Sequence, residues 1–163
     1  MEQRGSGHTV GSQKIYTKRF LDYQKDIQDA IDKLDFLNDP EALDKQNELK
    51  AMSIACDAIM ILGKRYAAMA REMAEKETDP IRKEELLQIA HNCDVVPAHK
   101  PETYWQAIQM YWFVHLGVTT ELNPWDAYSP GRLAQHPYPF YEHDVEAGLL
   151  DDENALDLLA CLW

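Results

Sequence analysis

One polar segment and one histidine have the residue types best suited to bind a polar substrate. Residues 119–132 (TTELNPWDAYSPGR) place Asp126 directly after Trp125, in a backbone restricted by proline and glycine. A carboxylate beside an indole ring is partly desolvated, so it binds a cation or a hydroxyl strongly or becomes a weaker acid. Apolar walls with a few placed polar groups are typical of ligand pockets. The alternative interpretation is that Asp126 caps a turn while Arg132 pairs with Glu121.

His8 stands in a Gly-His-Thr sequence near the start of the chain. A flexible glycine loop can bring an imidazole to a binding site, where a neutral ring can donate or accept a hydrogen bond. A lone histidine in a loop is also commonly just a solvent-exposed residue. His8 therefore becomes a candidate binding residue only in combination with a second group.

Four further residues, His136, Glu142, His143 and Asp144, have side chains of the kind that bind metal ions. Their spacing matches no zinc-binding helix pattern, and the prolines between them favour a solvated loop. A metal-dependent hydrolase that uses His136 and His143 is therefore the weakest functional hypothesis for this sequence, and no metal site is predicted. His115, on an apolar helix, is interpreted as a core histidine. The sequence also contains no nucleophile elbow, Walker loop or dinucleotide-binding glycine motif.

The elements that would position these residues are predicted to be helices. Helical periodicity appears over 16–35, 40–77, 80–92, 107–118 and 139–147, and again from 151 or 152 onward. Asp39-Pro40 and Asp79-Pro80 are typical helix starts, while residues 1–14 indicate a loop. We expect one apolar stripe along the long helix, formed by Met52, Ala55, Cys56, Ile59, Gly63, Tyr66, Ala70 and Met73. The helix over 107–118 is apolar on nearly all sides, so it should be buried all round.

Composition and charge exclude several classes of protein. The chain has 163 residues, of which 45% are hydrophobic and 27% charged, and its formal net charge is −12. Such an acidic surface repels phosphate backbones and anionic lipid, so neither nucleic acid nor membrane is an expected partner. Three widely spaced cysteines, no signal peptide and no transmembrane segment predict a protein of the cytoplasm.

The chain divides into three predicted regions. Residues 1–15 form the loop that bears His8, residues 16–94 form a helical region, and residues 95–163 hold the aromatic-rich helix, the pocket-lining loop and the start of a further helix. That last helix stops at Cys161-Leu162-Trp163 without a polar exit or a capping residue. We expect the chain to continue beyond this point in its parent protein. The alternative is a terminal helix whose Trp163 docks on the core.

Several motifs together carry a family resemblance. The most specific are PAHKPETY at 97–104, QAIQMYWFVH at 106–115, TELNPWD at 120–126, GRL at 131–133, QH at 135–136 and YPFY at 138–141. Weaker matches are EQR at 2–4, GHTV at 7–10, LDFLND at 34–39, IACDA at 54–58 and LGKRY at 62–66. These motifs resemble glycyl radical enzymes of the pyruvate formate-lyase-like superfamily over nearly the whole chain. The branch that dehydrates hydroxyproline looks most similar.

The resemblance implies a partial pyruvate formate-lyase domain over residues 1–163. It would be mainly α by itself and would form a helical segment of a ten-stranded α/β barrel. In such enzymes a separate S-adenosylmethionine-dependent activating enzyme installs a radical on a glycine near the C-terminus. A barrel cysteine then takes hydrogen from the small-molecule substrate, and water leaves. His8 and Asp126 match a histidine and an aspartate that contact the hydroxyproline-like substrate. Both residue types can stabilise a departing hydroxyl group.

The radical machinery of the family has no counterpart in this sequence. The reactive cysteine of the family stands in Gly-Cys-Val-Glu, a context that Cys56, Cys93 and Cys161 all lack, and the Arg-Val-x-Gly-Tyr radical loop is absent. No catalytic residue or bound cofactor is therefore assigned, and the chain alone is predicted to be inactive. Its partners would be the rest of the enzyme chain and the activating enzyme. The alternative is a non-enzymatic helical interaction module, or a split-gene half that pairs with a complementary chain.

Overall fold

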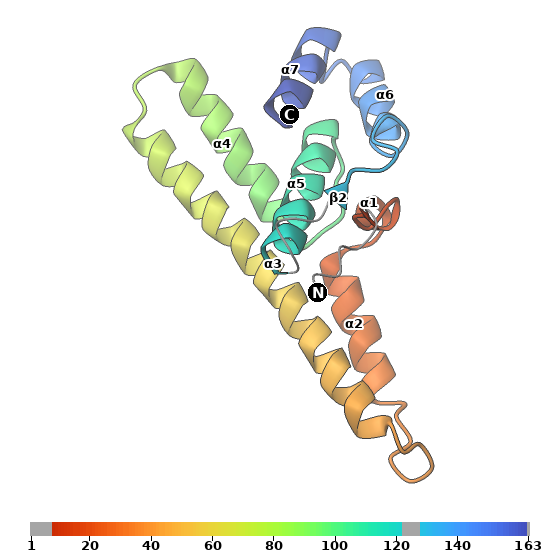
Figure 1. Ribbon diagram of the computed structural model, residues 1–163. Coiled ribbons are helices and arrows are strands. Elements are labelled where there is room, and N and C mark those ends of the chain that lie inside the picture. Colours follow the sequence, from red (N-terminus) through yellow and green to blue (C-terminus); the bar gives the residue numbers. More distant parts are fainter. Residues whose placement is uncertain (1–7, 122–127, 163) are drawn as a thin grey trace, which may run out of the picture.

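The computed structural model describes residues 8–121 and 128–162, and the side chains of residues 8, 9, 121 and 128 also lie outside the described part. The chain is mainly α, as predicted (Figure 1). Its elements are β1 (His8–Thr9), α1 (Lys14–Thr17), α2 (Phe20–Ile31), α3 (Ala42–Lys76), α4 (Pro80–Val95), α5 (Tyr104–Glu121), β2 (Tyr128–Ser129), α6 (Tyr138–Glu146) and α7 (Asp152–Leu162). The helices α3 to α7 start and end within a few residues of the predicted positions, whereas the single helix predicted over 16–35 is divided into α1 and the shorter α2. The boundaries of the three predicted regions stay a prediction.

The longest feature is an antiparallel hairpin of α3 and α4 (Figure 1). At 1.5 Å per residue, α3 is about 52 Å long. The side chain of Asp79 accepts the Ile81 N–H at 3.0 Å and Pro80 occupies the first turn of α4, which confirms the predicted start. Small residues line the contact on the α3 side: Gly63, Ala67, Ala70 and Ala74 are all buried. Small side chains let the two helix backbones approach closely.

The predicted apolar stripe of α3 is only partly right. Cys56, Ile59, Gly63 and Ala70 are buried, as expected. Met52, Ala55, Tyr66 and Met73 are instead exposed, and the buried face continues through Ala67 and Ala74. The physical reason is that helical spacing identifies a stripe but not its width. Because α4 approaches closely, the buried strip is narrow and made of alanines, so larger apolar side chains lie beside it.

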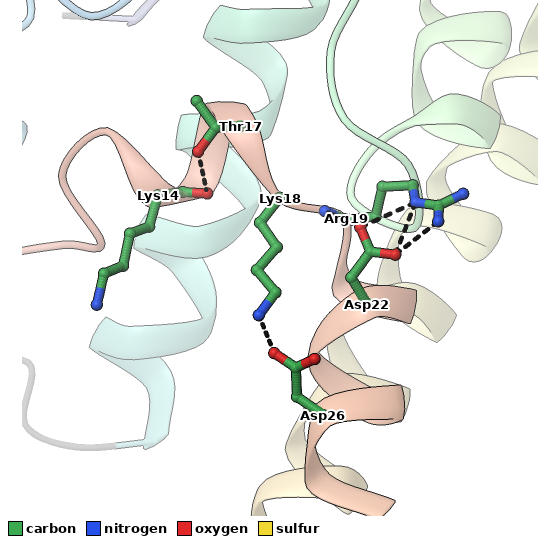
Figure 2. Close-up of polar contacts among 6 residues, drawn as sticks. All are labelled: Lys14, Thr17, Lys18, Arg19, Asp22 and Asp26. Carbon is green, nitrogen blue, oxygen red and sulfur yellow. Dashed lines mark hydrogen bonds and ion pairs between the residues drawn. The ribbon is translucent and has the colours of Figure 1, made fainter. Parts of the chain in front are cut away.

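Ion pairs organise the junction between α1 and α2, which Figure 2 shows in close-up. Arg19 and Asp22 cap the first turn of α2: the Arg19 N–H donates to Asp22 at 3.1 Å and the guanidinium donates to the same carboxylate at 2.6 Å. This contact lowers the pKa of Asp22 to about 2. Lys18 pairs with Asp26 one turn further along. The Thr17 hydroxyl donates to the carbonyls of Gln13 and Lys14. The chain direction therefore changes between α1 and α2 with its polar groups satisfied.

The core lies around α5. Ala107, Met110 and Phe113 are at most 1% exposed, while Trp112 on the same helix is 41% exposed. The prediction of burial on nearly all sides is thus right only for the first part of the stretch, because the residues from His115 to Val118 are half-buried. Among the residues that the structure describes, no helix combines the length and apolar content needed to cross a membrane.

A buried carboxylate joins α6 to the start of α5. Asp144 is 3% exposed, and its side chain accepts the Tyr104 N–H at 2.7 Å. A negative charge at this position also complements the dipole of α5. The prediction of a solvated loop here is therefore wrong, because Asp144 lies inside the fold and caps a helix 40 residues away. Gly148, with φ +69°, follows α6 as the predicted closing residue.

The final helix packs on α5 through a separate small cluster. Ala155 of α7 is buried together with Tyr104 and Ile108 of α5, and Leu158, Leu159 and Leu162 pack around them, whereas Leu156 is exposed. The expectation about Trp163 falls outside the described residues.

Candidate functional site

The two segments that carry the candidate binding residues meet in a short parallel strand pair. His8 pairs with Tyr128 and Thr9 with Ser129. The Val10 N–H extends the pairing by donating to the carbonyl of Ser129 at 3.4 Å. Parallel pairing needs a long crossover, which α1 to α5 provide. Residues more than a hundred positions apart in the sequence are thereby brought side by side.

This pairing locates the backbone of one predicted site residue and the neighbourhood of the other. His8 lies in β1, and paired strands run about 4.8 Å apart, so its backbone adjoins that of Tyr128. Asp126 precedes Tyr128 by two positions and lies outside the described residues. The structure therefore brings the His8 backbone to the strand that follows Asp126. How the two side chains face each other lies outside the described part.

An aromatic and apolar layer supports this strand pair. Val10, Ile15 and Tyr16 are buried in one cluster with Tyr111 and Val114 of α5. Burial raises the pKa of the Tyr16 phenol above its usual value, with a smaller contribution from the neighbouring Tyr111. Tyr16 is therefore a neutral hydroxyl at any physiological pH. The prediction of a simple loop over residues 1–14 missed β1 because a two-residue strand has no periodicity to detect.

Three aromatic side chains, those of Tyr111, Trp112 and His115, contact one another near the middle of α5. The Tyr111 hydroxyl and the Nδ1 atom of His115 lie 3.2 Å apart, and the His115 ring is stacked with Trp112 at 5.9 Å between centroids. The interpretation of His115 as a histidine satisfied within the fold agrees with these contacts. Because α5 ends at Glu121, this group lies on the helix that leads into the Asp126 segment.

His136 holds the segment after β2 against the segment after β1. Its Nε2 atom lies 3.4 Å from the Ser12 hydroxyl, and its ring lies 6.1 Å from that of the buried Tyr16. His136 is half-buried, so the sequence-based prediction of a solvated loop is wrong here. Pro137, one of the prolines taken to favour a solvated loop, is itself fully buried.

A tight turn connects β2 to His136. The Ser129 hydroxyl accepts the Gly131 N–H at 3.0 Å, and Gly131 adopts φ +65°, a conformation that favours glycine. The carbonyl of Arg132 then accepts the N–H groups of Gln135 at 2.8 Å and of His136 at 3.0 Å. Ser129 and His136 therefore belong to one folded turn.

The described part of the chain, 8–121 and 128–162, brings no three metal-ligating side chains together. The two histidines considered for a metal site have different neighbours: His136 contacts Ser12, whereas the Nδ1 atom of His143 lies 3.0 Å from Asp144. The structure gives no support to a hydrolytic metal centre built from them.

A separate apolar pocket of about 410 Å³ opens between α1, α2 and α3. Its walls are mainly carbon, and include Phe20, Ile27, Met52 and Cys56. Asp26, at its edge, is already paired with Lys18.

Comparisons with known proteins identify the chain's relatives. The family model described as pyruvate formate lyase-like matches residues 1–163. Trans-4-hydroxy-L-proline dehydratase of Clostridioides difficile is 66% identical over 163 residues, which are 100% of this chain and 21% of that protein. The crystal structure of that dehydratase with trans-4-hydroxy-L-proline bound superposes with a TM-score of 0.93, again over 100% of this chain and 21% of the solved chain.

Two more distant relatives show the same pattern. Isethionate sulfite-lyase of Desulfovibrio desulfuricans is 38% identical over 151 residues, which are 93% of this chain and 18% of that protein. A glycyl radical enzyme from Archaeoglobus fulgidus has 37% identity and a TM-score of 0.89, over 97% of this chain and 20% of the solved one. The chain thus spans about a fifth of the length of the relatives it matches.

Proposed function

This chain belongs to the pyruvate formate lyase-like family, and we propose that it forms one wall of the substrate pocket in a glycyl radical dehydratase that acts on trans-4-hydroxy-L-proline. The observation that carries the proposal is the 66% identity to such a dehydratase over the whole chain. The pairing of the His8 strand with the strand that follows Asp126 supports it.

Within the pocket, His8 and Asp126 would bind the polar groups of the substrate. Dehydration removes a hydroxyl group, and a poor leaving group of this kind needs a proton or strong hydrogen bonds at its oxygen. An imidazole can supply a proton and a carboxylate can hold a hydroxyl or an ammonium group. We assign both residues to substrate binding in this sense.

The groups that carry the radical would lie outside this chain. Hydrogen abstraction is the chemistry that the glycyl radical supplies in such enzymes, and the three cysteines here lack the family's reactive context. Burial raises the pKa of Cys56 and Cys93, which makes these thiols less reactive. We therefore propose that the reactive cysteine and the radical glycine lie in other parts of a longer polypeptide. A separate S-adenosylmethionine-dependent activating enzyme would generate the radical.

Apolar side chains on the surface support a longer polypeptide. Large apolar side chains of the described helices are exposed, among them Ile54, Ile61, Met69 and Ile81. We propose that other parts of the same enzyme cover them.

Binding of trans-4-hydroxy-L-proline to the full-length protein tests the proposed function. Isothermal titration calorimetry on the enzyme without its radical should show saturable binding. His8→Ala and Asp126→Ala should each weaken it roughly 10- to 100-fold, the effect of losing a hydrogen bond in which one partner is charged. Lys50→Ala, on the exposed side of α3, is the control and should bind like the unchanged protein.

Turnover provides a second readout. The full-length enzyme treated anaerobically with its activating enzyme should dehydrate trans-4-hydroxy-L-proline, and this chain alone should not. Failure of the full-length protein to bind or dehydrate that compound would contradict the assigned substrate. Turnover by the 163-residue chain would contradict the assignment of the reactive groups to other parts of the polypeptide.

A further inference from the structure

The strand pair that carries His8 is too small to hold itself in place. Each strand has two residues, and the Val10 N–H adds one long bond of 3.4 Å to Ser129. Two-stranded pairs are marginally stable in water even when the strands are longer. Additional contacts must therefore hold the His8 segment in register with β2.

The first such contact lies just beyond both strands. Ser12 follows β1 in a turn with φ +50°, and its hydroxyl lies 3.4 Å from the Nε2 atom of His136. At this length the hydrogen bond is weak. It nevertheless joins the two segments at a second point, separate from the backbone pairing.

The second contact is between rings. The centroid of the His136 ring lies 6.1 Å from that of Tyr16, with 31° between the ring planes. Tyr16 is only 4% exposed and packs in the same cluster as Val10, the residue that extends the strand pairing. His136 therefore rests on a ring that is itself fixed in the core.

His136 is also fixed from its own side. Its N–H donates to the Arg132 carbonyl at 3.0 Å, inside the turn that begins at Ser129. Since the Ser129 carbonyl accepts the Val10 N–H and His136 contacts Ser12, the segment 129–136 contacts the N-terminal segment at two separate places. Two points of contact determine the orientation of the N-terminal segment relative to β2 as well as its distance from β2.

We propose that His136 is a positioning residue of the substrate pocket. Through Ser12 and Tyr16 it keeps the strand of His8 in register with β2, and so sets where the His8 imidazole can meet the substrate. We call these three residues, Ser12, Tyr16 and His136, the clasp. The inference rests on the proposed function, because it concerns the placement of a substrate-binding residue.

The first test measures the clasp without any substrate. Hydrogen–deuterium exchange of the full-length protein should show faster exchange in the peptide covering residues 8–16 when His136→Ala is introduced. Ser12→Ala, which keeps a non-glycine residue at the same backbone conformation, should give a smaller increase. His91→Ala, an exposed histidine on α4, is the matched control and should leave exchange in this peptide unchanged. Unchanged exchange in both clasp variants would overturn the inference.

The second test measures binding of trans-4-hydroxy-L-proline by calorimetry. His136→Ala should raise the Kd about 5- to 30-fold, and His136→Gln, which can still reach the Ser12 hydroxyl, should recover part of that loss. In a His8→Ala background, His136→Ala should add little, because the residue that it positions is gone. A merely structural role would instead give the same loss in both backgrounds, and that result would overturn the inference.

The two tests separate the inference from the proposed function. If the unchanged full-length protein does not bind trans-4-hydroxy-L-proline, the proposed substrate is wrong, whereas His136-dependent exchange in residues 8–16 would still support the clasp. If the unchanged protein binds and the variants neither exchange faster nor bind more weakly, the proposed function stands and the role of His136 is refuted.

Discussion

At the scale of single residues, two of the three cysteines in this chain are buried and the third is exposed. Cys93 is 3% exposed, and burial, assisted by the negative charge of Asp94, raises the pKa of its thiol to about 11. Cys56 is also buried and its thiol pKa is raised. Cys161 is exposed. Since the thiolate is the reactive form, the three thiols should differ in reactivity.

We predict that iodoacetamide at pH 8 modifies Cys161 at least tenfold faster than Cys93 in the folded chain. About one Cys93 thiol in a thousand is ionised at that pH, and the side chain is also shielded from the reagent. Mass spectrometry of peptides from a labelling time course provides the measurement. In denaturant the two sites should label at similar rates, and equal rates in the folded chain would contradict the prediction.

The same pKa determines how Cys93 affects stability at alkaline pH. The folded-state pKa of about 11 lies above the ordinary value of 9.0. As pH rises from about 9 toward 11, the unfolded chain therefore releases its proton first. The contribution of Cys93 to the free energy of unfolding consequently falls over this window.

The sequence does not predict contacts between residues that lie far apart in the chain. Asp79 caps α4 through a neighbour two positions away, and the local Asp-Pro pattern was enough to predict it. Ser12 and His136 are separated by 124 positions, and Asp144 and Tyr104 by 40. No short pattern encodes such pairs, which explains why His136 and Asp144 were both assigned to a solvated loop.

At the scale of elements, periodicity locates helices well but does not show how closely they pack. The start of α4 follows from its Asp79 cap, whereas apolar spacing locates α3 and α5 only to within a few residues. The close contact of α3 with the end of α4 depends on Gly63, whose role is set by three-dimensional contacts. A Cβ atom at that position would lie 2.9 Å from Cδ of Pro97 and 3.1 Å from the carbonyl oxygens of Cys93 and Val96.

We predict that Gly63→Ala lowers the free energy of unfolding by about 1–2 kcal/mol. Overpacking against backbone atoms costs about 1–3 kcal/mol, and the gain in helix propensity returns up to about 1 kcal/mol. Gly117→Ala is the matched control, because its Cβ would meet only the flexible end of Ile59, at 2.8 Å. Urea unfolding followed by circular dichroism should show a lower midpoint for the first variant and little change for the second. The opposite order would show that the two helices can move apart at low cost.

At the scale of the whole molecule, composition predicts a folded acidic protein but not which apolar residues remain uncovered. The middle of α3 illustrates the difference. Ala51, Ile54, Ala58 and Ile61 recur at helical spacing on a side of the helix away from its buried face, and all four are exposed. Exposed apolar surface of this kind marks an interaction site in soluble proteins. Since this chain spans about a fifth of its relatives' length, we propose that further parts of the polypeptide cover this face.

That proposal predicts that one pair of substitutions has little effect on the stability of this chain alone but destabilises the full-length protein. In this chain alone, Ile54→Gln with Ile61→Gln should change the free energy of unfolding by no more than about 0.5 kcal/mol per site, because these side chains are 68% and 54% exposed. In the full-length protein each substitution should cost about 1.5–3 kcal/mol, because a buried apolar side chain is replaced by a polar one. The temperature of thermal unfolding would fall accordingly.

Lys64→Gln, an exposed position on the polar side of the same helix, controls for the general effect of introducing glutamine. It should leave both proteins unchanged. If the full-length protein tolerates the isoleucine substitutions as well as this chain does, the face is exposed in both contexts. This apolar face would then belong to a different interaction, such as that of a helical module with a complementary chain.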